Sequence, residues 1–367
     1  IGYSCLGAAL IKLEKYEDAE TVLEHALELN PKDDLAKTNI ASIYKHKGMH
    51  AQALQNSLDL ITINPNCPVA HNNLGCAFAD LQMFPAAIQA FETALTIDSK
   101  NIDALVNIGK IYSDLRETDL AIEHYQKALE ILEENNDHRI PFVKFYLSFE
   151  LLSRGQMKQG WEFYEHGFSD SIPQMARRTP NRIFDNPKWN GQAIHGKKLL
   201  IWREQGLGDE IRMYSILGDL PYDTMNITVE CDSRLIKPLS RSFPKIAFKA
   251  CDSDGTQGNK YDFHFPTASL PMLFRNHPND FKRSAPYILT DGQKTAKFHD
   301  RLKKEEGKIK IGICWRSGLL HSTRNMHMTN LVDWAPFLKD PKFSIVNLQY
   351  GDCENEIIEV ENLYNCK

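Results

Sequence analysis

Small and large apolar residues alternate with a fixed period along the first third of the chain. Large side chains such as Leu74, Phe78 and Phe91 stand at helical spacing. Between them, small residues recur every 34 positions at Gly7, Ala41, Gly75 and Gly109, and again at Ala19, Ala53, Ala87 and Ala121. Small residues let two helices approach closely, but one helix pair cannot bury its own apolar face. The period therefore predicts a stack of antiparallel helix pairs.

The period resembles the tetratricopeptide repeat family over roughly residues 1–133, with Pro31 and Pro65 ending the first two units. Small and aromatic residues keep the internal offsets of a fifth, degenerate unit at Ser148, Gly155, Gly160, Tyr164 and Gly167. We therefore predict a tetratricopeptide superhelix over residues 1–168, with four regular repeats and a degenerate fifth.

Asparagine recurs in phase with the repeats, at Asn39, Asn73 and Asn107. Each lies two residues before a small residue, on the helix that lines the concave face in this family. An amide offers both a donor and an acceptor, so such a ladder could clamp a peptide backbone, or it could bond only to neighbouring repeats. The ladder resembles that of protein O-linked N-acetylglucosamine transferases, although Cys5 replaces the amide in the first repeat.

The pattern changes after the repeats. Prolines interrupt residues 169–196, and we expect an extended connector. Its Arg177, Arg178 and Arg182 could face a phosphate, but we expect them to be solvated. From Lys197 onward, short apolar runs alternate with helical stretches, which favours a doubly wound parallel sheet. The expected strands are 198–202, 226–230, 246–250, 261–265, 308–315 and 343–350, and the expected helices are 210–220, 233–243, 291–304 and 330–339. This division gives one α/β unit at 197–290 and the start of a second at 291–367.

The loop after the first of these strands carries the candidate chemistry. Gly206 and Gly208 would allow a tight turn close to a ligand, at the carboxyl end of the sheet and the start of a helix. Asp209 could act as a general base or simply as the N-cap of that helix, and the sequence leaves both open. A dinucleotide fingerprint would need glycine at Ile211 and would use Glu230 on the ribose, so a dehydrogenase is disfavoured.

The runs 198–209, 261–271, 285–287, 311–318 and 347–351 look like those of heptosyltransferase-like glycosyltransferases with two Rossmann domains (GT-B) that follow tetratricopeptide repeats. The resemblance implies a base at Asp209 and an acceptor loop at Gln205, Gly206 and Gly208. It also implies that the nucleotide-sugar is held, without a metal or another cofactor, by Trp315, Arg316, Ser317 and Arg324. Only the start of the donor-binding half is expected within these residues.

Composition and charge narrow the class of protein. The net charge of −5 and isoelectric point near 6.2 argue against nucleic-acid binding, and no apolar run is long enough for a membrane helix. The eight cysteines form no C-x-x-C pair, which indicates reduced thiols in a cytoplasmic protein rather than a metal site. The sequence thus predicts a glycosyltransferase whose groove holds a protein or peptide acceptor. The alternative is a non-catalytic interaction scaffold with a degenerate α/β domain, and self-association through the repeats is open in both.

Overall fold

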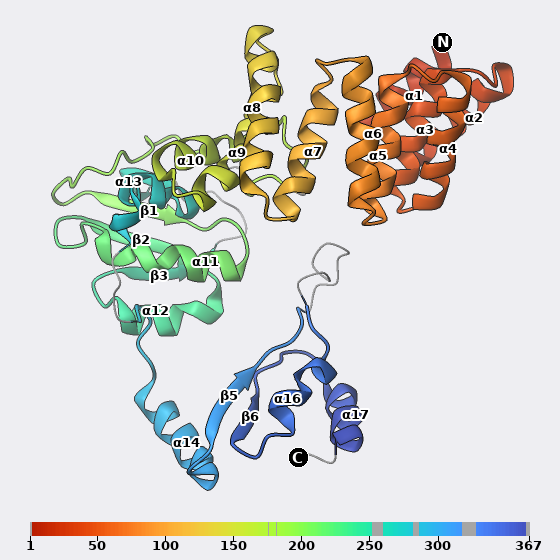
Figure 1. The fold of residues 1–367 in the computed structure, drawn as a ribbon. Helices are drawn as coiled ribbons and strands as arrows, with labels where there is room; N and C mark the ends of the chain where they lie inside the picture. The colour runs from red at the N-terminus through yellow and green to blue at the C-terminus, as the bar shows by residue number, and fades with distance from the viewer. Residues whose placement is uncertain are drawn as a thin grey trace. The chain divides into compact units, whose positions relative to one another are not determined.

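The computed structural model describes residues 2–174, 176–180, 182–251, 260–281, 286–317 and 328–364 (Figure 1). The chain divides into two compact units, Ile1–Tyr287 and Ile288–Lys367. Each unit has a hydrophobic core of its own.

The first unit begins with antiparallel helix pairs, which Figure 1 shows side by side in chain order. The pairs are α1 (Gly2–Lys12) with α2 (Tyr16–Leu29), α3 (Asp34–His46) with α4 (His50–Ile63), α5 (Pro68–Asp80) with α6 (Phe84–Ile97), α7 (Ile102–Asp114) with α8 (Thr118–Glu134), and α9 (Ile140–Ser153) with α10 (Met157–Tyr164). The helical solenoid predicted from the 34-residue period is therefore present, and a 3-10 turn, η1 (Glu165–Phe168), ends it.

Size complementarity holds the two helices of a repeat together. A Cβ atom on Gly75 would lie 2.5 Å from the ring of Phe91, and one on Gly109 would lie 2.8 Å from the ring of Tyr125. Both rings are buried. The equivalent positions of the second repeat hold Ala41 and the buried Ser57, so a larger residue on one helix coincides with a smaller one on the other. The small residues are thus needed for close packing rather than for turns.

A four-stranded parallel sheet follows in the same unit, in the order β3-β2-β1-β4. Its strands are β1 (Lys198–Trp202), β2 (Asn226–Cys231), β3 (Ala247–Ala250) and β4 (Phe263–Pro266). The connector reaches the edge strand through a bridge between Lys188 and His264, and the buried Trp189 anchors it in the core. Short helices accompany the strands: α11 (Leu207–Met213), α12 (Ile236–Ser242) and α13 (Leu270–Phe274).

The second unit contains a two-stranded parallel sheet of β5 (Ile309–Ile313) and β6 (Phe343–Asn347). Its helices are α14 (Gly292–Leu302), α16 (Ala335–Leu338) and α17 (Glu354–Tyr364). Ile313, Trp315, Leu331 and Val360 are central to its core.

The strands lie where the apolar runs predict them, within a few residues, but three helices are shorter than expected. Residues 233–243 form a 3-10 turn, Ser233–Leu235, and then α12. Residues 210–220 form α11 and then a 3-10 helix, Tyr214–Asp219, because Gly218 and Pro221 disfavour a continued α-helix. Residues 330–339 likewise begin as a 3-10 helix before α16, since Pro336 lacks the N–H that a longer helix would use.

We predict that Gly75→Ala lowers the free energy of unfolding by about 1–3 kcal/mol, because the new methyl group must displace the Phe91 ring. Gly218→Ala is the matched control, since a Cβ there meets no atom within 4 Å. Urea unfolding followed by circular dichroism measures both. Equal stability of the two variants would contradict the packing argument.

Candidate functional site

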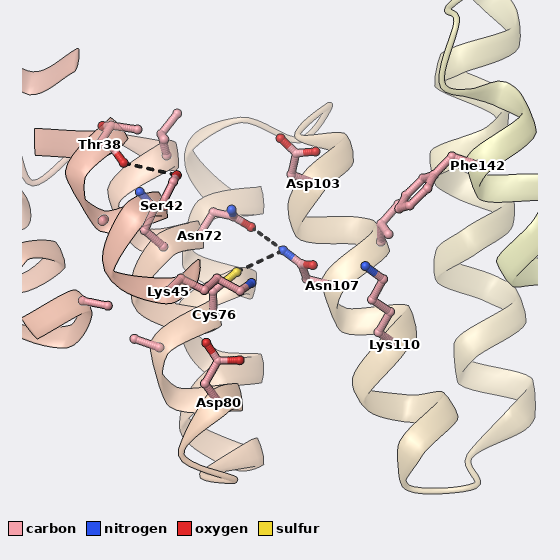
Figure 2. Close-up of a pocket in the computed structure, with 16 residues that line it drawn as sticks. Thr38, Ser42, Lys45, Asn72, Cys76, Asp80, Asp103, Asn107, Lys110 and Phe142 are labelled. Atoms are coloured by element: carbon pink, nitrogen blue, oxygen red, sulfur yellow. Dashed lines mark hydrogen bonds between the residues drawn. The ribbon is translucent and has the colours of Figure 1, made fainter. Parts of the chain in front are cut away.

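A groove of about 410 Å³ runs across the first helices of the second to fifth repeats (Figure 2). Its walls come from α3, α5, α7 and α9, because the same helix of each pair faces the same side of the stack. The polar and aromatic residues that line it are Thr38, Ser42, Lys45, Asn72, Asn73, Asp80, Asp103, Asn107, Lys110 and Phe142.

The three asparagines of the predicted ladder do not share one environment in the structure. Asn73 and Asn107 line the groove, whereas Asn39 donates its amide to the Ser4 carbonyl at 3.3 Å and is not among the lining residues. Asn107 donates to Asn72 Oδ1 at 3.1 Å and to Cys76 Sγ at 3.4 Å. The repeat spacing alone did not reveal Asn72, since only one repeat has asparagine at that position.

The Nδ2 atom of Asn73 is buried and has no hydrogen-bond partner among the described residues. A buried donor without a partner costs roughly 1–3 kcal/mol, so native structures seldom keep one. Because Asn73 lines the groove, a rotation of its amide would let a carbonyl oxygen of a bound chain satisfy this donor.

The groove also carries charge. Asp80 lies 3.6 Å from His50, and Asp103 lies 3.6 Å from Arg139. Lys110 makes no ion pair with any described acid, and its ammonium lies 4.8 Å and 5.2 Å from the ring centres of Tyr146 and Phe142. Burial and the nearby Lys45 ammonium lower the pKa of Lys110, while Asp103 and Asp114 act in the opposite direction.

The loop after β1 differs from the expectation in its backbone. The left-handed residue is Gln205, at φ 66°, while Gly206 is extended at φ −88°. A Cβ on Gly208 would meet no atom within 4 Å, so neither glycine is required by a close approach. Gln205 holds its conformation because its N–H donates to the Thr179 carbonyl at 3.1 Å. The left-handed turn predicted at the glycines is thus made by Gln205, while the approach of a ligand to Gly206 and Gly208 stays a prediction.

Asp209 lies on the first turn of α11, with its side chain 45% exposed. Arg212 pairs with it at 3.1 Å. Gly206 occupies the N-cap position, so Asp209 does not cap this helix.

The solvated arginines expected in the connector are instead buried or paired. The Arg178 side chain is fully buried and binds Glu165 at 2.9 Å, Glu204 at 2.5 Å and Ser269 Oγ at 2.9 Å. Its guanidinium also lies 4.1 Å from the Phe168 ring centre. These partners come from the last repeat, the end of β1 and the turn after β4. A buried arginine needs such partners, and sequence spacing did not indicate them.

A second buried ion pair argues against the dinucleotide-binding alternative. Glu230 is fully buried and pairs with Arg182 at 2.5 Å and Lys249 at 3.4 Å. Its carboxylate is therefore occupied by cations of the chain and does not face a ribose.

In the second unit, two of the residues predicted to bind the nucleotide-sugar, Trp315 and Arg316, contact Glu356 of α17. Trp315 is buried and donates from Nε1 to Glu356 at 2.5 Å, and Arg316 pairs with the same carboxylate at 2.5 Å. The Tyr350 hydroxyl lies 3.4 Å from Ser317 Oγ. A phosphate would have to compete with Glu356 for Arg316. Arg324 lies outside the described residues.

No group of three or more potential metal ligands occurs among the described residues. A search of the same residues for a helix with the length and hydropathy of a membrane span gives none.

Residues 1–33, 69–101 and 102–135 each match the tetratricopeptide repeat family. The first part of the chain is built of tetratricopeptide repeats. Protein FlbA of Caulobacter vibrioides is 30% identical over 226 residues, which are 56% of this chain and 37% of FlbA. The chain thus spans little more than a third of the length of that relative.

Two solved structures are similar to the first part of the chain at low identity. TTC0263 of Thermus thermophilus, a thermophilic tetratricopeptide repeat protein, is 22% identical with a TM-score of 0.42, over 48% of this chain and 94% of its own. Pseudomonas aeruginosa pilF is 18% identical with a TM-score of 0.40, over 47% and 76% of the two chains.

We predict that Arg178→Met lowers the free energy of unfolding by about 3–5 kcal/mol, because it leaves Glu165 and Glu204 without their buried counter-charge. The control is Lys127→Met, which breaks only the half-exposed pair with Glu123 and should cost at most about 1 kcal/mol. Urea titration compares them. A loss for Arg178→Met no larger than that of the control would show that the network is not structural.

Proposed function

We propose that the chain is a protein-interaction scaffold whose repeat groove binds an extended polypeptide segment of a partner. The observation that carries this proposal is the buried, unpartnered Nδ2 of Asn73 within a groove lined by further amides. Tetratricopeptide repeats in the first part of the chain support a protein partner.

The chemistry of the groove suits a main chain better than a small metabolite. Asn72, Asn73 and Asn107 supply donors and acceptors from successive repeats, as a peptide backbone requires. Ala41, Ala77 and Val106 between them leave room without adding charge. Side-chain amides recognise backbone groups irrespective of sequence, so selectivity must come from other lining residues.

We predict that Asn73→Ala weakens binding of a peptide selected from a random library on the full chain by about threefold to tenfold, since one buried hydrogen bond is lost. Asn39→Ala is the matched control: it has the same repeat position but lies outside the groove lining. Fluorescence polarisation of the labelled peptide reports affinity. Equal affinities for the two variants would contradict the groove as the binding site, and failure to select any peptide would contradict the proposal.

Glycosyl transfer is the second candidate function. The strand order β3-β2-β1-β4 is that with which doubly wound nucleotide-binding folds begin, and the half-exposed Asp209 follows the carboxyl end of β1. In this proposal Asp209 takes the proton of the acceptor hydroxyl, while Gln205, Gly206 and Gly208 shape the acceptor loop of the first unit. Within the second unit, Arg316 would leave Glu356 to bind the donor diphosphate. The groove would then present the acceptor peptide.

Calorimetric titration with a UDP-sugar and an ADP-sugar tests this candidate. Saturable binding would support it, and in that case Asp209→Asn should lower transfer by the ~10²–10⁴-fold that a general base contributes. Arg212→Gln, which removes only the partner of Asp209, should leave transfer measurable. No binding of either sugar nucleotide would exclude the second candidate while leaving peptide binding untouched.

A further inference from the structure

Helix α9 of the fifth repeat is apolar overall, and its faces differ little in hydrophobicity. One side, with Val143, Leu147 and Leu151, packs into the core shared with α7 and α8. Phe145 is buried in a cluster with Tyr164 of α10 and Met213 of α11. A helix that is apolar all round normally has every face covered.

The remaining side of α9 is not fully covered. Phe142, Tyr146 and Phe149 follow one another at spacings of four and three and therefore share one stripe. Phe142 and Tyr146 are half-buried, with ring centres 4.9 Å apart, and Phe149 is 45% exposed. We name these three residues the α9 stripe. It is continuous with the groove, because Phe142 is one of the groove-lining residues.

A cation faces the start of the stripe. The Lys110 ammonium lies over both Tyr146 and Phe142, and Figure 2 shows Lys110, Asn107 and Phe142 projecting toward the same space. The acids of the groove, Asp80 and Asp103, lie near His50 and Arg139, respectively. Lys110 thus adds positive charge that no described carboxylate of the chain neutralises by an ion pair.

We propose that Lys110 and the α9 stripe form a specificity subsite for an acidic residue followed closely by a large apolar or aromatic residue of the bound segment. This inference rests on the proposed peptide-binding function. The carboxylate pairs with Lys110 while its ammonium stays over the rings, and the apolar side chain covers the exposed part of the stripe. Charge complementarity at Lys110 favours this occupant, since Lys110 has no ion-pair partner among the described acids, whereas the charge of Lys45 is offset by the nearby Asp80.

The experiment is selection of a random peptide library on the full-length chain, followed by affinity measurements with the selected peptides on variants. We expect acidic–apolar pairs to be enriched. Lys110→Gln should weaken their binding about tenfold, and Lys110→Glu should reverse the preference toward basic residues. Phe149→Ser changes an exposed residue and should reduce the preference for the apolar partner without unfolding the helix.

Lys144→Gln is the matched control. Lys144 also lies over an aromatic ring, that of Phe163 at 5.4 Å, but it is not in the groove lining, so affinity should stay within about twofold. Two outcomes would overturn the subsite and leave the proposed function standing. The selected peptides could depend on Asn73 but show no enrichment of acidic–apolar pairs, or they could bind Lys110→Gln with unchanged affinity. A library that yields no peptide would overturn both. Association of two copies of the chain through the α9 stripe could also change the measured affinity. Light scattering would then show a larger mass, and that result would also overturn the inference.

Discussion

The close approach of the two helices within each repeat is the constraint on which the groove depends. Gly75 leaves room for Phe91, and Gly109 leaves room for Tyr125, so each helix pair is set at a short and repeated distance. Asn73 and Asn107 lie two residues before these glycines. Because the glycines must face the second helix, the asparagines are turned toward the opposite, concave side. The binding surface is therefore a consequence of core packing.

A different interaction joins the last repeat to the sheet. Arg178, buried and held by Glu165 and Glu204, bridges the end of the solenoid and the end of β1. Gly167 is required beside it, since a Cβ there would lie 2.5 Å from Arg178 Cδ. Such a network adds little net stability compared with apolar packing, but loss of one partner is costly. It explains why the repeats and the four-stranded sheet form one compact unit.

The sequence predicts the positions of helices and strands better than it predicts the environments of individual side chains. The 34-residue period and the apolar runs locate the helix pairs and strands because they report burial, which is periodic. The arginines of the connector were expected in solvent, since nothing in the local sequence reveals a distant Glu204. Asn39 was grouped with Asn73 by period alone, yet the Ser4 carbonyl of the preceding repeat occupies it. The left-handed Gln205 was missed because glycines stand beside it and are the usual residues for that conformation.

The central claim is that an extended segment occupies the groove formed by the second to fifth repeats. A crystal structure of the full chain with a library-selected peptide tests it most directly. The account predicts peptide density along α5, α7 and α9, with a carbonyl oxygen within hydrogen-bond distance of Asn73 Nδ2. Peptide bound on the opposite side of the solenoid, or over the loop after β1 with the groove filled only by water, would contradict it.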